Sequence, residues 1–393
     1  MGALRQITIQ AAPATPHPAA APPPRRWLRG AAWAAYAVVA TLGLLELTLP
    51  LLDARFAPYF RRTLERSPNV REEIRAVLES PTFDPDLGWT KRPAADNYAP
   101  GKDYLAQAYG DSFTQSHLGA EEVAWEDYFE RSTGHTILNF GVGGYGLDQA
   151  VLAFEKWGAE YPGRIALLGL YHQMYRRAHA HHSFYYFRNP QAWRYVFKPM
   201  LARKGGGYEL LPPPCLDAAC LEAVLFDESH PIRRTLAAHD HWYRQNAARP
   251  RPGFPRTIAF ARALPELLED AAENRGRRDY FFVTEDSVDL AMALVGRFVH
   301  TAEERHMTPI MLLLYSASDL EIMRRGVRWD DALRARLDAA GIASIDASPY
   351  ISAAMAGKDL RSLRTEDGHM NESGDRLIAE ALAEGLGRLG QLH

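Results

Sequence analysis

Apolar runs alternate with amphipathic segments from residue 104 to the end of the chain, apart from one long interruption. Continuous apolar runs predict five buried strands, at 104–109, 136–142, 164–171, 309–316 and 342–348. Helical periodicity predicts helices at 121–132, 147–161, 287–306, 329–341 and 372–390. Such alternation predicts an α/β fold with a doubly wound, mainly parallel five-stranded sheet.

The interruption, at about 178–280, is rich in aromatic residues, Pro and Arg and predicts a long irregular insertion after the third strand. Its alternating histidines, His179, His181 and His182, have no carboxylate or cysteine at a ligand-like spacing. We therefore expect a solvated or substrate-lining loop here, and we expect neither a metal nor a cofactor in the protein.

The N-terminal part does not have a globular pattern. Residues 1–29 include an Ala/Pro-rich stretch that predicts a disordered tail, and residues 30–52 predict a transmembrane helix. Glu46 is the one charged residue of that span and lies near its far end. A cleaved signal peptide and a buried soluble helix are the alternatives. Residues 53–102 predict a connector whose aromatics pack on the domain at 103–393.

Composition narrows the function classes only a little. The 393 residues are 47% hydrophobic and 24% charged, with a net charge of -3, which is typical of a globular protein and gives no reason to expect a nucleic-acid partner. Cys215 and Cys220 are the only cysteines. Outside the cytosol they could form a small-loop disulfide, and the alternative is two ordinary small residues.

The loops that follow the predicted strands carry the candidate chemistry. Ser112 follows the first strand at a turn into a helix, where a hydroxyl is exposed and a backbone N–H can face an oxyanion. His369, before the last helix, is the candidate base, and Glu366 or Asp367 is the candidate acid that orients it. Gly144, after the second strand, is the candidate second oxyanion donor. Taken singly, Ser112 is equally a helix N-cap and His369 an ordinary loop residue.

Three short segments, GDSF at 110–113, NFGVGGYG at 139–146 and DGHMNESG at 367–374, resemble the motifs of the SGNH or GDSL hydrolase superfamily. The resemblance implies a flavodoxin-like sheet, Ser112 as nucleophile, Gly144 in the oxyanion hole and His369 as base. The usual acid stands three residues before the histidine, which is Glu366 here. Extracytoplasmic polysaccharide O-acetylation enzymes of the superfamily use an Asp-x-His spacing, which favours Asp367.

The third motif of the superfamily departs from its pattern. An Asn is expected after the third strand, but the run here is LLGLYHQMYRR, and Gln173 is nearest to that position. Its amide can donate as an Asn amide does, one methylene further out. The glycines of GVGGYG also fit a dinucleotide-binding fingerprint, but the next strand ends without the acidic residue that would hold a ribose.

The resemblance, together with the predicted transmembrane helix at 30–52, therefore implies a membrane-anchored serine esterase or O-acyltransferase on the periplasmic side. Its implied substrate is an acylated carbohydrate, and the motifs give no protein partner. Esterase and transferase share all of these residues, so the sequence leaves the two activities open. The altered third motif keeps a second alternative open, a catalytically degenerate protein that binds carbohydrate or supports assembly on the same scaffold.

Overall fold

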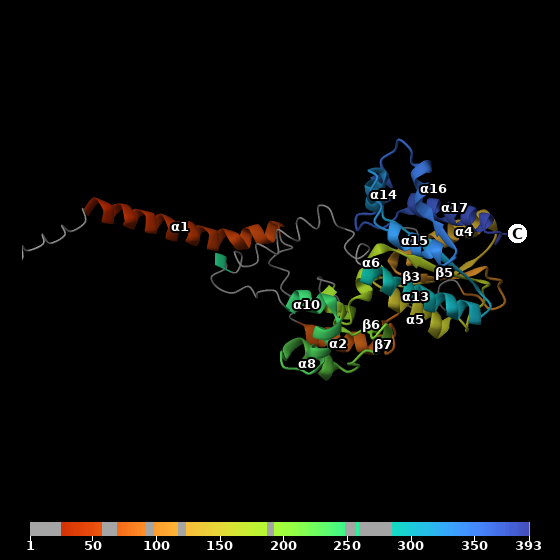
Figure 1. Ribbon diagram of the computed structural model, residues 1–393, viewed down its shortest axis with the longest axis horizontal. Helices are drawn as coiled ribbons and strands as arrows, with labels where there is room; N and C mark the ends of the chain where they lie inside the picture. Colours follow the sequence, from red (N-terminus) through yellow and green to blue (C-terminus); the bar gives the residue numbers. More distant parts are fainter. Residues whose placement is uncertain are drawn as a thin grey trace, which may run out of the picture.

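In the computed structural model of the protein, the described residues are 25–56, 69–90, 98–116, 123–186, 192–247, 257–258 and 285–392. Most of the tail predicted at 1–29 lies outside them. The first helix, α1 (Arg25–Phe56), stands apart from the globular body in Figure 1, and its stretch Arg29–Thr48 is long and apolar enough to cross a membrane. A signal sequence meets the same criterion, so the helix fits the predicted transmembrane helix and the signal-peptide alternative, whereas a stretch that is 0% buried does not fit the third possibility, a buried soluble helix.

A five-stranded parallel sheet forms the centre of the body, as the alternating pattern predicted. Its strands are β3 (Ala106–Gly110), β4 (Ile137–Gly141), β5 (Ile165–Leu170), β8 (Thr308–Leu313) and β9 (Ser344–Asp346), in the order β4-β3-β5-β8-β9. The strands are almost fully buried because helices cover both faces. The strand order reverses at β3 and β5, and in such sheets ligands bind beyond the carboxyl ends of the strands at this switch point.

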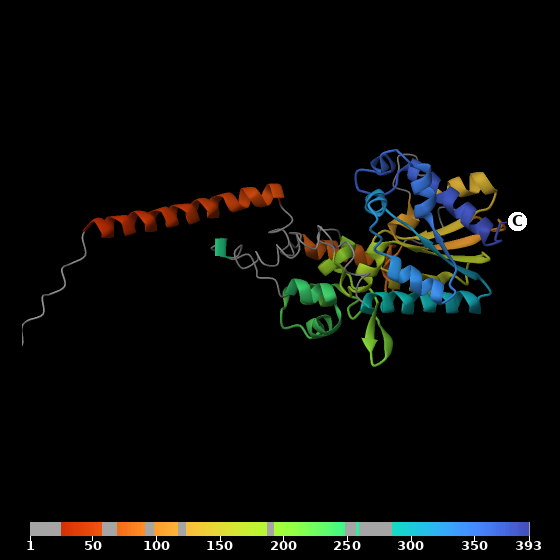
Figure 2. The same ribbon diagram turned by 45° about the horizontal axis from the view of Figure 1, so that its top comes forward.

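The helices form two layers on the sheet (Figures 1 and 2). One layer contains α4 (Trp125–Thr133), α16 (Ala347–Ala354) and α17 (Glu372–Arg388), and the other contains α5 (Leu147–Trp157), α13 (Glu285–Glu304) and α15 (Asp331–Ala339). Four short helices follow strand ends or precede α17, namely α3 (Ser112–Gln115), α6 (His172–Ala178), α14 (Ala317–Arg324) and η3 (Leu360–Leu363). The predicted α/β class is confirmed.

The segment before the first sheet strand packs on the body through aromatic residues, as predicted. It contains α2 (Val70–Glu79), β1 (Phe83–Asp84) and β2 (Gly88–Trp89). The buried Trp89 donates from Nε1 to the carbonyl of Gly143 at 3.1 Å, and the Tyr145 hydroxyl donates to the Trp89 carbonyl at 2.8 Å. These bonds attach the segment to the loop that follows β4.

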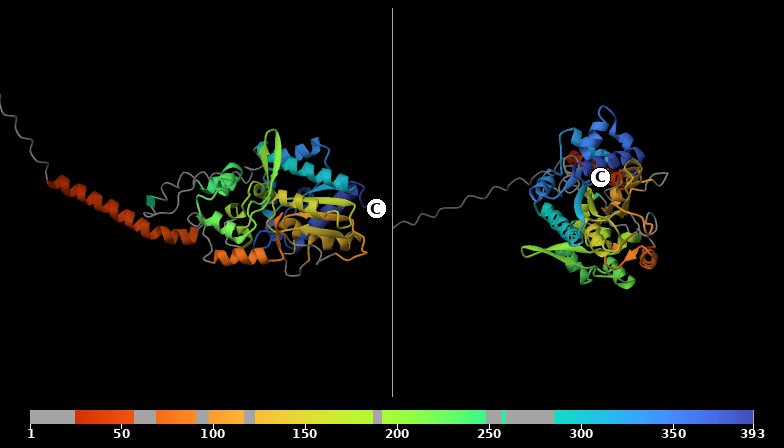
Figure 3. Two further views of the ribbon diagram at one scale, coloured as in Figure 1. Left: turned by 90° about the horizontal axis from the view of Figure 1, so that it is seen from below. Right: turned by 90° about the vertical axis from the view of Figure 1, so that its right-hand side faces the viewer.

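The prediction of a wholly irregular insertion is wrong for much of 178–247. This part contains α7 (Ser183–Tyr186), η2 (Ala192–Tyr195), β6 (Met200–Lys204), β7 (Gly207–Leu211), α8 (Ala218–Phe226), α9 (Ile232–His239) and α10 (His241–Ala247). The β6–β7 hairpin projects from the body in Figure 3. The elements are shorter than the windows in which periodicity can be recognised, so their pattern is hard to detect. The rest of the insertion, apart from 257–258, lies outside the described residues up to 284.

Two of the three predicted histidines, His181 and His182, are buried rather than solvated, and His179 is half-buried, which corrects the expectation of a solvated loop. His181 and His182 are 1% and 0% exposed, and burial lowers the pKa of His181 to about 4 and that of His182 to about 3. Their backbone N–H groups donate to the carboxylate of Asp240 at 2.7 and 3.0 Å. The tertiary contact with Asp240 holds this loop inward, which local sequence does not reveal.

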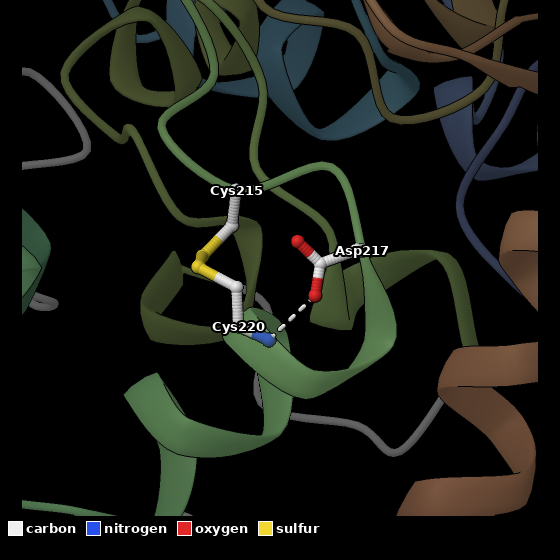
Figure 4. The surroundings of a disulfide bond; sticks show 3 residues. All are labelled: Cys215, Asp217 and Cys220. Atoms are coloured by element: carbon white, nitrogen blue, oxygen red, sulfur yellow. Dashed lines mark hydrogen bonds between the residues drawn. A yellow bond between two sulfur atoms is a disulfide. The ribbon is translucent and has the colours of Figure 1, made fainter.

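Cys215 and Cys220 form a disulfide, one of the two alternatives that the sequence left open (Figure 4). Asp217 lies within the closed loop and caps α8, because its carboxylate accepts from the backbone N–H of Cys220 at 2.9 Å. The disulfide thus closes the turn that begins α8.

Candidate active site

Glycines at the ends of three neighbouring strands let α3 lie directly on the sheet. A Cβ atom at Gly110 in β3 or at Gly169 in β5 would collide with the buried side chain of Thr114 in α3. A Cβ atom at Gly141, which ends β4, would collide with the backbone nitrogen of Gln115. The glycines therefore place the turn that carries Ser112 at the switch point of the sheet.

The serine and the histidine predicted from the sequence lie within hydrogen-bond distance. Asp111 caps α3 by accepting from the backbone N–H of Phe113 at 2.9 Å, which leaves Ser112 as the first residue of the helix. His369, in the loop before α17, places Nε2 at 2.9 Å from the Ser112 hydroxyl oxygen. Its imidazole also packs beside the Phe113 ring, with centroids 5.1 Å apart. Two loops that are 257 residues apart in sequence thus meet at one point.

Asp367, and not Glu366, lies beside the histidine. Its carboxylate is 3.0 Å from His369 Nδ1, a contact at ion-pair distance that is not aligned as a hydrogen bond. The Thr365 hydroxyl also donates to Asp367. Burial acts to raise the pKa of Asp367, but the Thr365 hydrogen bond and the charge of His369 outweigh it and keep that pKa below its usual value. Glu366 is exposed and makes no ion pair or hydrogen bond within the part of the chain that the structure describes.

The glycine loop after β4 contains a residue in a left-handed conformation and is bonded to α3. Gly144 has φ of +82°, a conformation that favours glycine. Its neighbour Gly143 donates its N–H to Gln115 Oε1 at 2.7 Å. Asn139 connects the loop to α3, since its amide donates to the Thr114 carbonyl at 2.7 Å and accepts from the Gly141 N–H at 2.8 Å. Asn139 belongs to the sequence motif, but the motif alone does not predict that its side chain connects α3 to this loop.

Gln173 lies in α6, and its amide is held by Arg177. The Gln173 Oε1 accepts from Arg177 Nη2 at 2.7 Å, and no hydrogen bond joins Gln173 to Ser112 among the described residues. An oxyanion role for Gln173 therefore stays a prediction. The adjacent His172 is buried with Nδ1 3.5 Å from the Asp319 carboxylate, which gives it a partner away from the serine. The role of Arg177 was not predicted from the sequence, because two adjacent arginines do not form a recognisable functional motif.

Two buried carboxyl groups lie behind the site. Burial raises the pKa of Glu126 to about 8, although a hydrogen bond from the Asn139 amide acts in the opposite direction. Burial likewise raises the pKa of Asp375 to about 7, although the Ser116 hydroxyl donates to it. Near neutral pH these groups retain much of the proton occupancy that an exposed carboxyl group would have lost, so the stability of the folded protein depends on pH through them.

No protein-family model and no curated protein matches the chain. Solved structures do match, and those that match include GDSL-type hydrolases, as the motifs predicted. A lipolytic protein of the G-D-S-L family from Veillonella parvula is 14% identical with a TM-score of 0.34, covering 72% of this chain and 99% of its own. A GDSL-like lipase from Bacteroides thetaiotaomicron is 12% identical with a TM-score of 0.33, covering 76% and 94%.

A third match is a two-domain esterase active on acetylated mannans. It is 10% identical with a TM-score of 0.36, covering 73% of this chain and 49% of its own. At these identities and TM-scores the similarities carry no argument about substrate or reaction. The strand order and the contact between Ser112 and His369 are observed in this chain itself.

Replacing Glu126 with Gln should change how stability depends on pH. As the pH rises from about 4.5 to about 8, the unfolded chain releases a proton that folded Glu126 retains, so the wild type loses stability. The amide of the variant does not titrate. Urea unfolding should therefore show the variant gaining roughly 2–4 kcal/mol relative to wild type between pH 5 and pH 8.5.

Glu79→Gln, on the exposed side of α2, is the matched control for this experiment. Its stability difference from wild type should be the same at both pH values. An equal difference at pH 5 and pH 8.5 for the Glu126 variant would show that this carboxyl group does not titrate abnormally.

Proposed function

We propose that the protein is a serine-dependent acyl ester hydrolase or O-acyltransferase that works through an acyl-serine intermediate. The observation that supports this most directly is the 2.9 Å contact between His369 Nε2 and the Ser112 hydroxyl, with Asp367 3.0 Å from the other ring nitrogen. A nucleophile, a base and an orienting acid in contact are what acyl transfer requires.

In the proposed first step, the Ser112 oxygen attacks the acyl carbonyl carbon while His369 Nε2 takes the hydroxyl proton. The tetrahedral intermediate collapses, the C–O bond to the leaving alcohol breaks, and His369 returns the proton to that alcohol. In the second step, His369 removes a proton from water or from a sugar hydroxyl, whose oxygen attacks the acyl-serine. Ser112 is released with its proton restored, and the product is a carboxylic acid or a new ester.

The proposed oxyanion donors are the backbone N–H groups of Ser112 and Gly144 and the side-chain amide of Gln173. The support for these donors is their position in the fold: Ser112 begins α3, Gly144 lies in the loop after β4 with φ of +82°, and Gln173 follows β5 at the switch point. Each donor lost from such a site costs roughly 2.7–4 kcal/mol of transition-state stabilisation. We therefore expect the replacement of the usual Asn by Gln173 to have a measurable effect on the rate of acyl transfer.

For the substrate, we propose an O-acylated, and specifically O-acetylated, carbohydrate. The support is the resemblance of the sequence motifs and the proposed location outside the cytoplasm. Hydrolysis and transfer differ only in whether water or a sugar hydroxyl attacks the acyl-serine. Both outcomes use the same three side chains, so the two activities form one proposal.

For the location, we propose an extracytoplasmic domain held by the single N-terminal helix. The helix contains the apolar stretch Arg29–Thr48, and the Cys215–Cys220 disulfide suits an oxidising compartment. The boundaries at 30–52, 53–102 and 103–393 remain predictions.

Changing Ser112 to Ala should abolish both covalent labelling by a fluorophosphonate probe and release of p-nitrophenol from p-nitrophenyl acetate. The reason is that no other hydroxyl among the described residues contacts His369 Nε2. Labelling is read on a gel and turnover by absorbance, with circular dichroism confirming that the variant folds. If the wild type neither labels nor turns over, the degenerate carbohydrate-binding alternative is supported instead.

Asp367→Asn and Glu366→Gln form a matched pair that assigns the acid. We expect Asp367→Asn to lower kcat by about 10²-fold or more, because the amide cannot stabilise the imidazolium. Glu366→Gln should leave kcat unchanged, since the exposed Glu366 carboxylate does not contact His369. The opposite ranking in a p-nitrophenyl acetate assay would assign the role to Glu366.

The full-length protein, expressed in a bacterial host, should stay in the membrane fraction after a carbonate wash. An apolar helix that spans the bilayer is not extracted by alkali, whereas a peripheral protein is. Thiol alkylation before and after reduction should show Cys215 and Cys220 blocked until the disulfide is reduced. A trimmed N-terminus in the soluble fraction would instead establish a cleaved signal peptide.

A further inference from the structure

The guanidinium group of Arg177 contacts the three segments that carry the proposed oxyanion donors, the turn before α3, the glycine loop after β4 and its own helix α6. From α6, its Nη1 donates to the Asp111 carboxylate at 2.8 Å and to the Tyr145 carbonyl at 3.0 Å, and its Nη2 donates to Gln173 Oε1 at 2.7 Å. Asp111 directly precedes Ser112, and Tyr145 directly follows Gly144. One side chain thus touches a residue at or beside each of the three donors.

The contact with Arg177 determines which way the Gln173 amide faces. A guanidinium group has donors only, so the amide must present its oxygen to Arg177 and turn its NH₂ group away. No hydrogen bond from that NH₂ group to protein is observed within the described ranges, and Gln173 is only partly buried. By contrast, Gln149 uses both ends of its amide, accepting from Gly146 N–H at 3.0 Å and donating to the Leu87 carbonyl at 2.7 Å.

The environment of Arg177 explains why an arginine is needed there. Arg177 and Asp111 are 5% and 0% exposed, so their charges are removed from water and must be satisfied by each other and by nearby polar groups. A planar fork with separate nitrogens can reach a carboxylate, a carbonyl and an amide oxygen together. The single nitrogen of a lysine has too few fixed directions to keep all three contacts.

We propose that Arg177 is a positioning residue that sets the oxyanion hole, chiefly by holding the Gln173 amide with its NH₂ group toward the substrate carbonyl oxygen. This inference rests on the proposed hydrolase or acyltransferase function. Arg177 itself touches no substrate, and its effect on the rate passes through the Gln173 amide that it holds. Gln173 is then the donor that replaces the Asn expected by resemblance.

The first test compares two substitutions in the full-length protein with p-nitrophenyl acetate as substrate. Gln173→Glu retains an oxygen acceptor for Arg177 but loses the donor, so we expect kcat to fall by about 10²-fold with no loss of thermal stability. Arg177→Lys keeps the charge beside Asp111 but releases the amide, so we expect a fall of ~10-fold in kcat with KM within about twofold of wild type. Arg176→Lys, on the neighbouring residue of α6, is the control and should leave kcat unchanged.

The second test is a double-mutant cycle of Arg177→Lys and Gln173→Ala. If Arg177 acts through Gln173, the double variant should have nearly the kcat of the slower single variant, because the second substitution has little left to remove. Effects that multiply would overturn the proposed route. If Arg177→Lys does not fold, Gln173→Glu still tests the proposal. A kcat equal to wild type would show that Gln173 is not an oxyanion donor, and Arg177 could then not act through it.

The proposed function and the positioning role of Arg177 can be disproved separately. A wild-type protein that neither reacts with the fluorophosphonate nor hydrolyses p-nitrophenyl acetate removes the proposed function and this inference with it. A wild type that does both, together with Gln173 and Arg177 variants of unchanged kcat, leaves the function standing and overturns the positioning role alone.

Discussion

Close contact between α3 and the strand ends is the constraint on which the site depends. At Gly110, Gly141 and Gly169 any Cβ atom would overlap atoms of α3, so three neighbouring strands must all lack a side chain where the helix lies. Close packing tolerates little extra volume, because overpacking a well-filled interior typically costs about 1–3 kcal/mol. The position of Ser112 is therefore set by the sheet on which α3 lies, and not by a surface loop.

Buried polar groups then fix the loops around α3. Asn139 joins the α3 backbone to β4, Arg177 joins α6 to Asp111 and to the glycine loop, and Ser116 donates to Asp375 in α17. Each contact joins segments distant in sequence, and each would leave a buried polar group unsatisfied if one partner were removed. The frame of the site is thus held by polar bonds that specify geometry, while apolar burial supplies most of the stability.

Whether a feature could be predicted from the sequence depends on how far apart along the chain the interacting residues lie. The five strands and the helices between them were predictable because their periodicity is local, and the serine and histidine were predictable because strand ends meet at one edge of a sheet. The buried state of His181 was not predictable, since it depends on Asp240, 59 residues away. Arg177 was not predictable either, because its role needs Asp111, 66 residues earlier.

The charged groups of the site are of two kinds, buried and exposed. This difference determines which substitutions can change the proton transfer without disturbing the fold. The side chains of Asp111 and Arg177 are 0% and 6% exposed, whereas that of Asp367 is 57% exposed. An ion pair in a low-dielectric interior is strong and costly to disturb, while an exposed pair contributes only about 0–1 kcal/mol and is weakened by salt. The orienting acid therefore depends on local geometry, through the Thr365 hydroxyl that donates to Asp367 and the Phe113 ring beside the imidazole of His369. Substitutions in this exposed loop can change the proton transfer while the buried frame that positions Ser112 stays intact.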